Sequence, residues 1–119
     1  MQEITVKFSL LYQYDPSKTG PTEGEIADWL AFDKDMRDAG VFVYAVGYHA
    51  PEPSLSRTVT IRDGSTNVTP GVTDHPGDVP AGLCVIDVPD IEAATEWAAR
   101  VPTARYGSVE IRTNVEYEG

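Results

Sequence analysis

Hydrophobic and polar side chains alternate along residues 4–14, and this period of two predicts a strand with one apolar face. The apolar set ends in Tyr12 and Tyr14. Residues 41–49 differ, because Val, Phe, Tyr and Ala occupy both alternating sets of positions. That pattern is typical of a strand that is covered on both of its faces.

A helix is predicted between these two strands. Turn formers and two prolines fill residues 15–21, which indicates a surface loop. Thr22 and Glu25 then have the spacing of a capping box, so we expect the helix to begin at Thr22 and to continue to Ala39. Gly40 can adopt the left-handed conformation that commonly ends a helix.

The second half of the chain predicts four more strands, a further helix and one long loop. In chain order these are strands 57–62 and 66–69 around an Asp63-Gly64 turn, a loop over 70–81, a strand over 82–88, a helix capped by Asp90 and stopped by Pro102, and a strand from Gly107. The whole order is β-α-β-β-β-α-β, which predicts an α+β, ferredoxin-like domain with an added hairpin.

Length and charge narrow the class of protein. The 119 residues suit one domain spanning 1–119. Nine basic against 19 acidic residues give a net charge of −10, which argues against a nucleic-acid partner because that binding depends on Lys and Arg.

No apolar run approaches the roughly 20 residues of a membrane span. Without a secretory signal pattern at its start, the chain is expected to be cytoplasmic, with Cys84 as a buried, inert thiol.

The doubly apolar strand also predicts an assembly. Two helices of the predicted length cover one face of a sheet, whereas residues 41–49 require a cover on the second face as well. The simplest way to bury this second face is to pack it against the same face of a second copy related by a twofold axis. We therefore expect a homodimer.

Several short motifs stand in an order that is characteristic of one family. They are Leu30-Ala31-Phe32-Asp33, Val46-Gly47-Tyr48-His49-Ala50-Pro51, Val59-Thr60-Ile61-Arg62-Asp63-Gly64, Val85-Ile86-Asp87-Val88-Pro89-Asp90, Glu96-Trp97-Ala98-Ala99-Arg100-Val101-Pro102 and Gly107-Ser108-Val109-Glu110-Ile111-Arg112. Together they resemble the YCII-related family, and within it the DGPF branch. The Asp-Gly-Pro-Phe motif is degenerate, because this chain has Pro70-Gly71-Val72-Thr73 there.

The resemblance implies a ferredoxin-like domain that forms a dimeric α+β barrel. Small lyases, oxygenases and isomerases share that fold, the family's relatives include a dehydrochlorinase, and a recurring association with extracytoplasmic-function sigma factors is known. A fold alone does not confer an activity, so the site residues carry the functional hypothesis.

Asp33 and Arg37 are the first candidates for a site. On a helical wheel Asp33 falls in a stripe with Ile26 and Leu30, which would turn a carboxylate inward. One interpretation is an ion pair between Asp33 and Arg37, which are four residues apart. The other is a partly buried carboxylate that moves a proton.

His49 is the second candidate, at the end of a predicted strand. A split β-α-β unit brings it to the same sheet edge as Tyr12 and Tyr14, and the long loop with Asp74 and His75 could close over that edge. We predict the main pocket there and a weaker second site at Asp33 and Arg37. The spacing of the histidines, the single cysteine and the acidic residues supports no metal site, and no nucleotide-binding motif is present, so no cofactor is expected.

Two functional hypotheses follow. The first is a homodimer that binds a small molecule and performs acid–base chemistry of the lyase or dehydrochlorinase type. Its catalytic residues would be His49 and Asp33, and its substrate-binding residues Tyr12, Tyr14, Asp74, His75 and Arg37. The second is a non-catalytic accessory or regulatory protein that acts through a protein partner such as an extracytoplasmic-function sigma factor.

Overall fold

The computed structural model describes residues 4–49, 52–71 and 77–116. Its elements are β1 (Val6–Tyr14), α1 (Glu25–Asp38), β2 (Phe42–Gly47), β3 (Arg57–Arg62), β4 (Ser65–Pro70), β5 (Val79–Val88), α2 (Ile91–Ala98), the short 3-10 helix η1 (Pro102–Arg105) and β6 (Ser108–Thr113). Each predicted strand and helix is present, but the order is β-α-β-β-β-β-α-β, with one strand more between the helices than the predicted β-α-β-β-β-α-β, because the hairpin adds two strands; η1 is a further addition.

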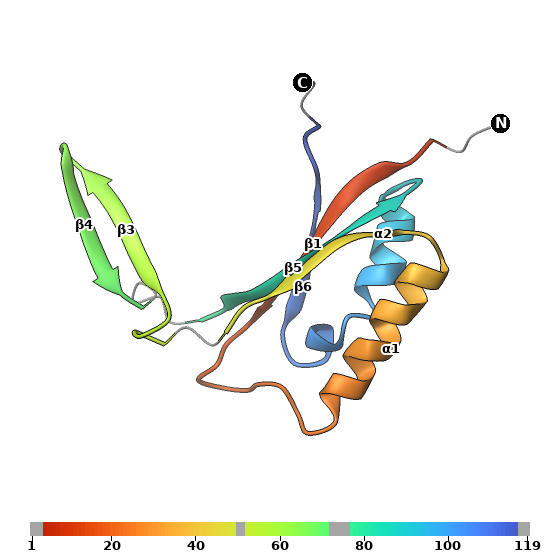
Figure 1. Cartoon of the computed structure of the whole chain (residues 1–119), viewed down its shortest axis with the longest axis horizontal. Coiled ribbons are helices and arrows are strands. Elements are labelled where there is room, and N and C mark those ends of the chain that lie inside the picture. The colour runs from red at the N-terminus through yellow and green to blue at the C-terminus, as the bar shows by residue number, and fades with distance from the viewer. Residues whose placement is uncertain (1–3, 50–51, 72–76, 117–119) are drawn as a thin grey trace.

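Four strands form one antiparallel sheet in the order β2-β5-β1-β6. If the β3–β4 hairpin is set aside, this is the strand order of a ferredoxin-like domain. Both helices lie against the same face of the sheet (Figure 1). The mixed α+β class and its ferredoxin-like arrangement therefore agree with the sequence.

The core lies between this face and the helices. Alternate residues of β1 and β5 point into it, as the register requires, and Phe32 and Met36 of α1 pack against them. The fully or nearly fully buried apolar side chains are Phe8, Leu10, Tyr12, Phe32, Met36, Val79, Cys84, Ile86, Val88, Ala94, Ala98 and Val101. Cys84 is thus the buried thiol that the sequence predicted.

The predicted start of the first helix is wrong. Helix α1 begins at Glu25 rather than Thr22, and Gly24 precedes it in the left-handed region with φ of 88° and no side-chain cap. The capping box does not form, because the Glu25 carboxylate binds the side chains of Trp29 and Tyr106 instead of a backbone N–H. Gly40, with φ of 73°, does follow the helix as expected.

The predicted inner face of this helix is also wrong. Ile26 and Leu30 are 76% and 66% exposed, whereas the buried or half-buried residues are Glu25, Trp29, Phe32 and Met36, with Asp33 half-buried at the edge of this set. The bulky aromatic residues and Met36 fill the space under the sheet, and this rotates the helix away from the Ile26 stripe. Asp33 therefore does not lie in the centre of the buried stripe.

The other bounds differ by smaller amounts. The loop expected over 70–81 is shorter than predicted, because Pro70 is the last residue of β4 and residues 79–81 already belong to β5. Helix α2 ends at Ala98, before Pro102, which instead begins η1. The Asp90 cap is confirmed, since its side chain accepts a hydrogen bond from the Ala93 N–H.

Strands β3 and β4 form a separate hairpin, hereafter the arm (residues 57–70), that projects from the body of the molecule (Figure 1). Val59 pairs with Val68 and Ile61 lies two positions further along, so one face of the arm is apolar. These three side chains are 59%, 58% and 64% exposed.

The sheet face away from the helices carries apolar side chains on β2, β5 and part of β1, whereas Glu110 and Arg112 of β6 make its other edge polar. Leu11 of β1 is opposite Leu83 of β5, and Tyr44 of β2 is opposite Val85. Within the described residues no helix covers this face, and Tyr44 is 57% exposed. The sequence predicted that this face is also covered, but no element in the described part of the chain packs on it.

Candidate functional site

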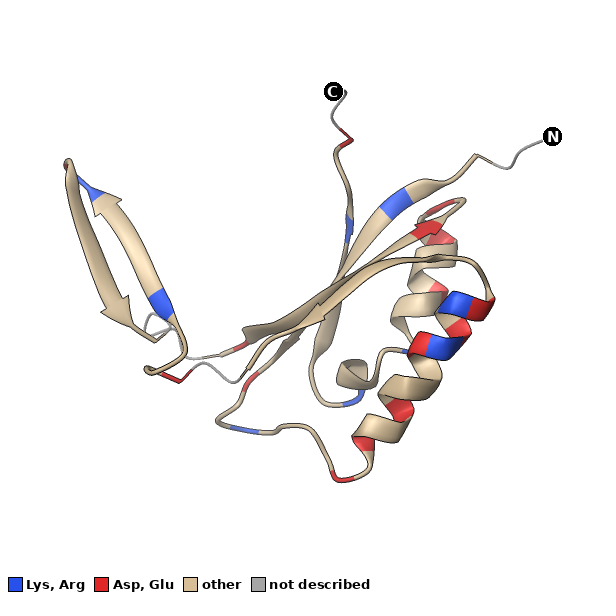
Figure 2. Ribbon diagram, in the orientation of Figure 1, with Lys and Arg blue, Asp and Glu red and all other residues tan. Residues whose placement is uncertain are grey.

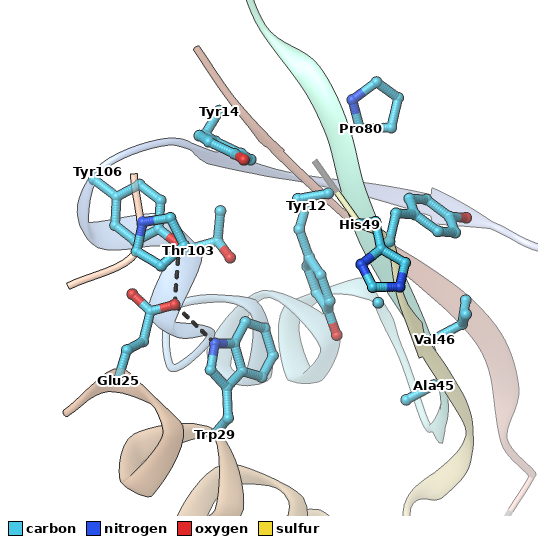
Figure 3. Close-up of a pocket in the computed structure, with 14 residues that line it drawn as sticks. Tyr12, Tyr14, Glu25, Trp29, Ala45, Val46, His49, Pro80, Thr103 and Tyr106 are labelled. Atoms are coloured by element: carbon cyan, nitrogen blue, oxygen red, sulfur yellow. Dashed lines mark hydrogen bonds between the residues drawn. The ribbon is translucent and has the colours of Figure 1, made fainter. Parts of the chain in front are cut away.

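A cavity of about 350 Å³ opens between α1, η1 and the end of the sheet from which the arm departs. Figure 3 shows its walls. They are formed by Tyr12, Tyr14, Pro21, Glu25, Trp29, Ala45, Val46, Gly47, Tyr48, His49, Pro80, Ala81, Thr103 and Tyr106. Aromatic rings and one buried carboxylate dominate this set.

The close approach of three strands positions the floor of the cavity. Gly82 is opposite Tyr12 on one side and Gly47 on the other, in the register of β5 with β1 and β2. Its φ is 153°, and a Cβ there would lie 2.4 Å from the Val46 carbonyl oxygen and 3.3 Å from the Tyr12 ring. Glycine at position 82 therefore lets β2 and the Tyr12 ring approach β5 closely.

The aromatic side chains come from elements that are far apart in sequence. The Tyr12 and Trp29 ring centroids are 5.1 Å apart in a tilted arrangement, and Tyr14 meets Tyr106 edge-to-face at 6.0 Å. Such geometries are favourable for aromatic pairs. They fix β1 against α1 and against the residue that follows η1, and so shape the cavity.

Glu25 is the charged group of this wall. Its residue is 7% exposed, and its Oε2 atom accepts hydrogen bonds from Trp29 Nε1 at 3.0 Å and from the Tyr106 hydroxyl at 3.1 Å. Its position at the first turn of α1 also suits a negative charge, because of the helix dipole. Among the described residues that line the cavity there is no Lys or Arg.

Two tyrosines of the cavity are held in the neutral form. Burial raises the pKa of Tyr12, whose hydroxyl also contacts the Cys84 thiol. Burial is also the main cause that raises the pKa of Tyr106, and the Glu25 carboxylate adds to it. Both phenols therefore act as neutral hydrogen-bonding groups rather than as bases.

The structure brings three of the sequence-predicted site residues together. Tyr12, Tyr14 and His49 all line the cavity, at the sheet edge where the split β-α-β argument placed them. Figure 3 shows His49 with Val46 on one side, across the cavity from Glu25. Asp74 and His75 lie outside the described residues.

Asp33 and Arg37 are not part of the cavity wall. Arg37 Nε donates to Asp33 Oδ2 at 2.8 Å, and the Arg37 guanidinium lies 4.0 Å from the centroid of the Phe42 ring. The Arg37 side chain is 57% exposed and the Asp33 side chain is 42% exposed. The ion-pair interpretation of these two residues is confirmed.

Sequence reasoning missed Glu25, Trp29, Thr103 and Tyr106 as cavity residues. Glu25 and Trp29 are four residues apart, which is the spacing of a side-chain contact on one helix face, so this pair carried a local signal. Tyr106 lies 81 residues from Glu25, and no local pattern could join them.

No group of three or more His, Cys, Asp or Glu side chains within residues 4–49, 52–71 and 77–116 is arranged to hold a metal ion. Neither of the helices α1 and α2 is long and apolar enough to cross a bilayer.

These features define a class: a ferredoxin-like α+β protein with two helices on one sheet face and an aromatic cavity at the sheet end. Comparison with protein families identifies the family of this chain. The model of the YCII-related domain matches residues 6–118, so the chain belongs to that family. A search of curated proteins finds no match to the chain.

Proposed function

We propose that the protein binds a small organic molecule in the cavity and that His49 exchanges a proton with it. The observation that carries this proposal is a cavity of about 350 Å³ that is walled by aromatic rings and contains a buried carboxylate. Its volume is within the range of roughly 300–1,000 Å³ for small-molecule sites, and a few polar groups among apolar walls are typical of them.

His49 supplies the acid–base group of the proposal. An imidazole can accept and donate a proton near neutral pH, whereas the raised pKa values keep Tyr12 and Tyr106 protonated. In a lyase-type elimination, His49 would remove a proton from one carbon while the leaving group departs with its electron pair from the adjacent carbon. A double bond forms between the two carbons.

Thermal-shift screening of a panel that contains acidic, aromatic and amine-bearing metabolites tests the binding step. A ligand at about 100 times its dissociation constant stabilises the fold by about 2.7 kcal/mol, which corresponds to a rise of several degrees in Tm for a domain of this size. His49→Ala should abolish turnover of any substrate found. Absence of stabilisation across the panel would contradict the proposal.

Asp33 and Arg37 remain the second, weaker site of this proposal. The pair is separate from the cavity wall, so Asp33→Ala should leave affinity for a cavity ligand unchanged. A loss of turnover in this variant with unchanged affinity would assign Asp33 a part in the reaction, whereas full activity would remove it.

We also propose that the chain forms a homodimer of the dimeric α+β barrel type, in the DGPF branch of the family. The open sheet face with Leu11, Tyr44 and Val85 and the apolar face of the arm both need a cover. An isolated two-stranded hairpin is at best marginally stable in water. A second copy would cover both surfaces at once.

Sedimentation equilibrium tests the dimer. The expected mass is twice the 13.0 kDa of the chain. Val59→Asn together with Ile61→Asn should weaken association, while Thr60→Asn with Thr69→Asn on the other face of the arm is the control. A stable monomer at micromolar concentration would contradict the proposal.

The arm also favours a second candidate function. Its exposed Val59, Ile61 and Val68 side chains could contact a different protein rather than a second copy. In that case the chain is an accessory or regulatory protein, with an extracytoplasmic-function sigma factor as the candidate partner. A monomer that binds such a factor, without stabilisation by any metabolite, would favour this function over ligand binding.

A further inference from the structure

We propose that the cavity selects an organic cation, such as a protonated amine or a quaternary ammonium group, over neutral and anionic molecules. This inference rests on the proposed function, because it names the class of ligand for the same cavity. Three observations support it: an uncompensated carboxylate, an aromatic lining and the charge of the whole chain.

The first observation concerns Glu25. Its carboxylate is buried, and of the described residues only Trp29 and Tyr106 donate side-chain hydrogen bonds to it. Both donors are neutral, so they satisfy an acceptor but leave the negative charge in place. A buried charge without a counter-charge is unfavourable. The first turn of α1 offsets part of this cost through the helix dipole.

Two basic side chains of neighbouring elements are engaged in ion pairs elsewhere. Arg105 of η1 pairs with Asp28 of α1 at 3.0 Å, and Lys18 of the preceding loop lies 3.9 Å from Asp15. Neither lines the cavity, and the basic group that the described residues do place in its wall, the His49 imidazole, lies across the cavity from Glu25. A cationic ligand would therefore provide the counter-charge that the described cavity walls do not.

The second observation concerns the rings around the carboxylate. Tyr12, Tyr14, Trp29 and Tyr106 all line the cavity, and their tilted and edge-to-face pairing turns them in different directions. The faces of aromatic rings carry negative charge density and attract ammonium groups, Trp most strongly. Figure 3 shows Glu25, Trp29 and Tyr106 gathered on one side of the cavity.

The third observation is the electrostatic field. The chain has a net charge of −10, and acidic residues are distributed along α1 from its first turn onward (Figure 2). A negative field raises the local concentration of cations and lowers that of anions. The arrangement thus disfavours an acidic ligand both inside the cavity and on approach to it.

Calorimetric titration with three probes of similar shape tests the inference on the unmodified protein. The probes are benzylamine, which is protonated at neutral pH, benzyl alcohol, which is neutral, and benzoate, which is negative. We expect benzylamine to bind roughly tenfold or more tightly than benzyl alcohol, from cation–π and charge–charge attraction. Benzoate should bind most weakly.

Glu25→Gln locates the effect. The amide keeps an acceptor for Trp29 and Tyr106 but removes the charge, so affinity for benzylamine should fall roughly tenfold while affinity for benzyl alcohol stays within about twofold. Glu23→Gln is the matched control, because it makes the same change in net charge at an exposed position two residues away.

Each outcome decides the inference. Equal affinity for benzylamine and benzyl alcohol, or an equal loss in the Glu23 and Glu25 variants, would overturn cation selection and leave the small-molecule proposal intact. Failure of all three probes to bind at millimolar concentration would overturn it as well. The thermal-shift panel decides separately whether the cavity binds any ligand.

Discussion

Glu25 joins two segments of the chain through one oxygen atom. Its Oε2 accepts from Trp29 on the same helix and from Tyr106 after η1, so it stabilises the fold as well as the cavity. Removing the acceptor leaves two polar groups without their partner, at a cost of about 1–3 kcal/mol for a buried group.

Glu25→Ala should therefore lower the free energy of unfolding by about 1–3 kcal/mol, whereas Glu25→Gln should lower it by less. Urea denaturation of both variants, with Glu23→Ala as a control at an exposed carboxylate, measures the difference. Equal stabilities of the Ala and Gln variants would show that the two hydrogen bonds contribute nothing.

Cys84 gives a pH dependence with a definite sign. Burial raises the pKa of its thiol to about 11, so the folded protein holds this proton more tightly than the unfolded chain does. As the pH rises toward 11, the unfolded thiol ionises first, and the stability that is fully present at lower pH is lost. The raised pKa of Tyr12 acts in the same direction.

We therefore expect the urea midpoint to fall steadily as the pH rises through the alkaline range up to about 11. At neutral pH the folded protein should resist alkylation by iodoacetamide, and the urea-unfolded chain should react, since the thiolate is the nucleophile. Rapid labelling of the folded protein would contradict the burial of Cys84.

Strand β5 depends on a glycine where it meets β2. Gly82 has φ of 153°, and a Cβ would lie 2.4 Å from the Val46 carbonyl oxygen. Gly82→Ala should destabilise the fold by roughly 2 kcal/mol or more, because both the backbone conformation and the contact become unfavourable.

Gly47→Ala is the control for this prediction. Gly47 pairs with Gly82 in the same ladder, but a Cβ there would meet nothing within 4 Å, so thermal unfolding should change little. A similar loss of Tm in both variants would show that strand propensity, rather than the close approach at Gly82, determines the effect.

Elements with a strong local signal were predictable from the sequence. The alternation of β1, the Asp90 cap and the Asp63-Gly64 turn each depend on a few neighbouring residues, and all three are present in the structure. Asp63 and Gly64 have φ of 51° and 76°, as a tight hairpin turn requires.

The rotation of α1 was not predictable in the same way. Ile26 and Leu30 fit a helical stripe as well as Trp29 and Phe32 do, and only packing against β1 and α2 separates the two choices. The same reason explains the candidate site: chain topology brought His49 to Tyr12, while Glu25 and Tyr106 meet only through the rotated helix and η1.

The whole molecule is extended for its length. The Cα radius of gyration is 16.7 Å and the extents are 54 × 42 × 20 Å, whereas a compact domain of this length has a radius near 13–14 Å. The projecting arm accounts for the difference. The arm contains Arg57, Arg62 and Asp63 as its charged residues, within a chain of net charge −10.

This charge predicts how salt affects the proposed dimer. Two chains that each carry −10 repel one another, and the Debye length falls from about 30 Å at 0.01 M salt to about 8 Å at 0.15 M. The dimer should therefore become tighter as sodium chloride is added over this range. Sedimentation equilibrium measures this change, and weaker association at higher salt would show that attraction between charges dominates the interface.

Tyr48 and His49 line the cavity and begin the connection that leads from β2 to the arm. Pro80, which also lines the cavity, lies at the start of β5, where the connection back from the arm ends; these two connections are the stems of the arm. A molecule bound between these stems would favour one orientation of the hairpin. By thermodynamic linkage, any such preference works in both directions. Pairing of two subunits through the hairpin would then raise the affinity for the bound molecule by the same factor by which that molecule strengthens the pairing.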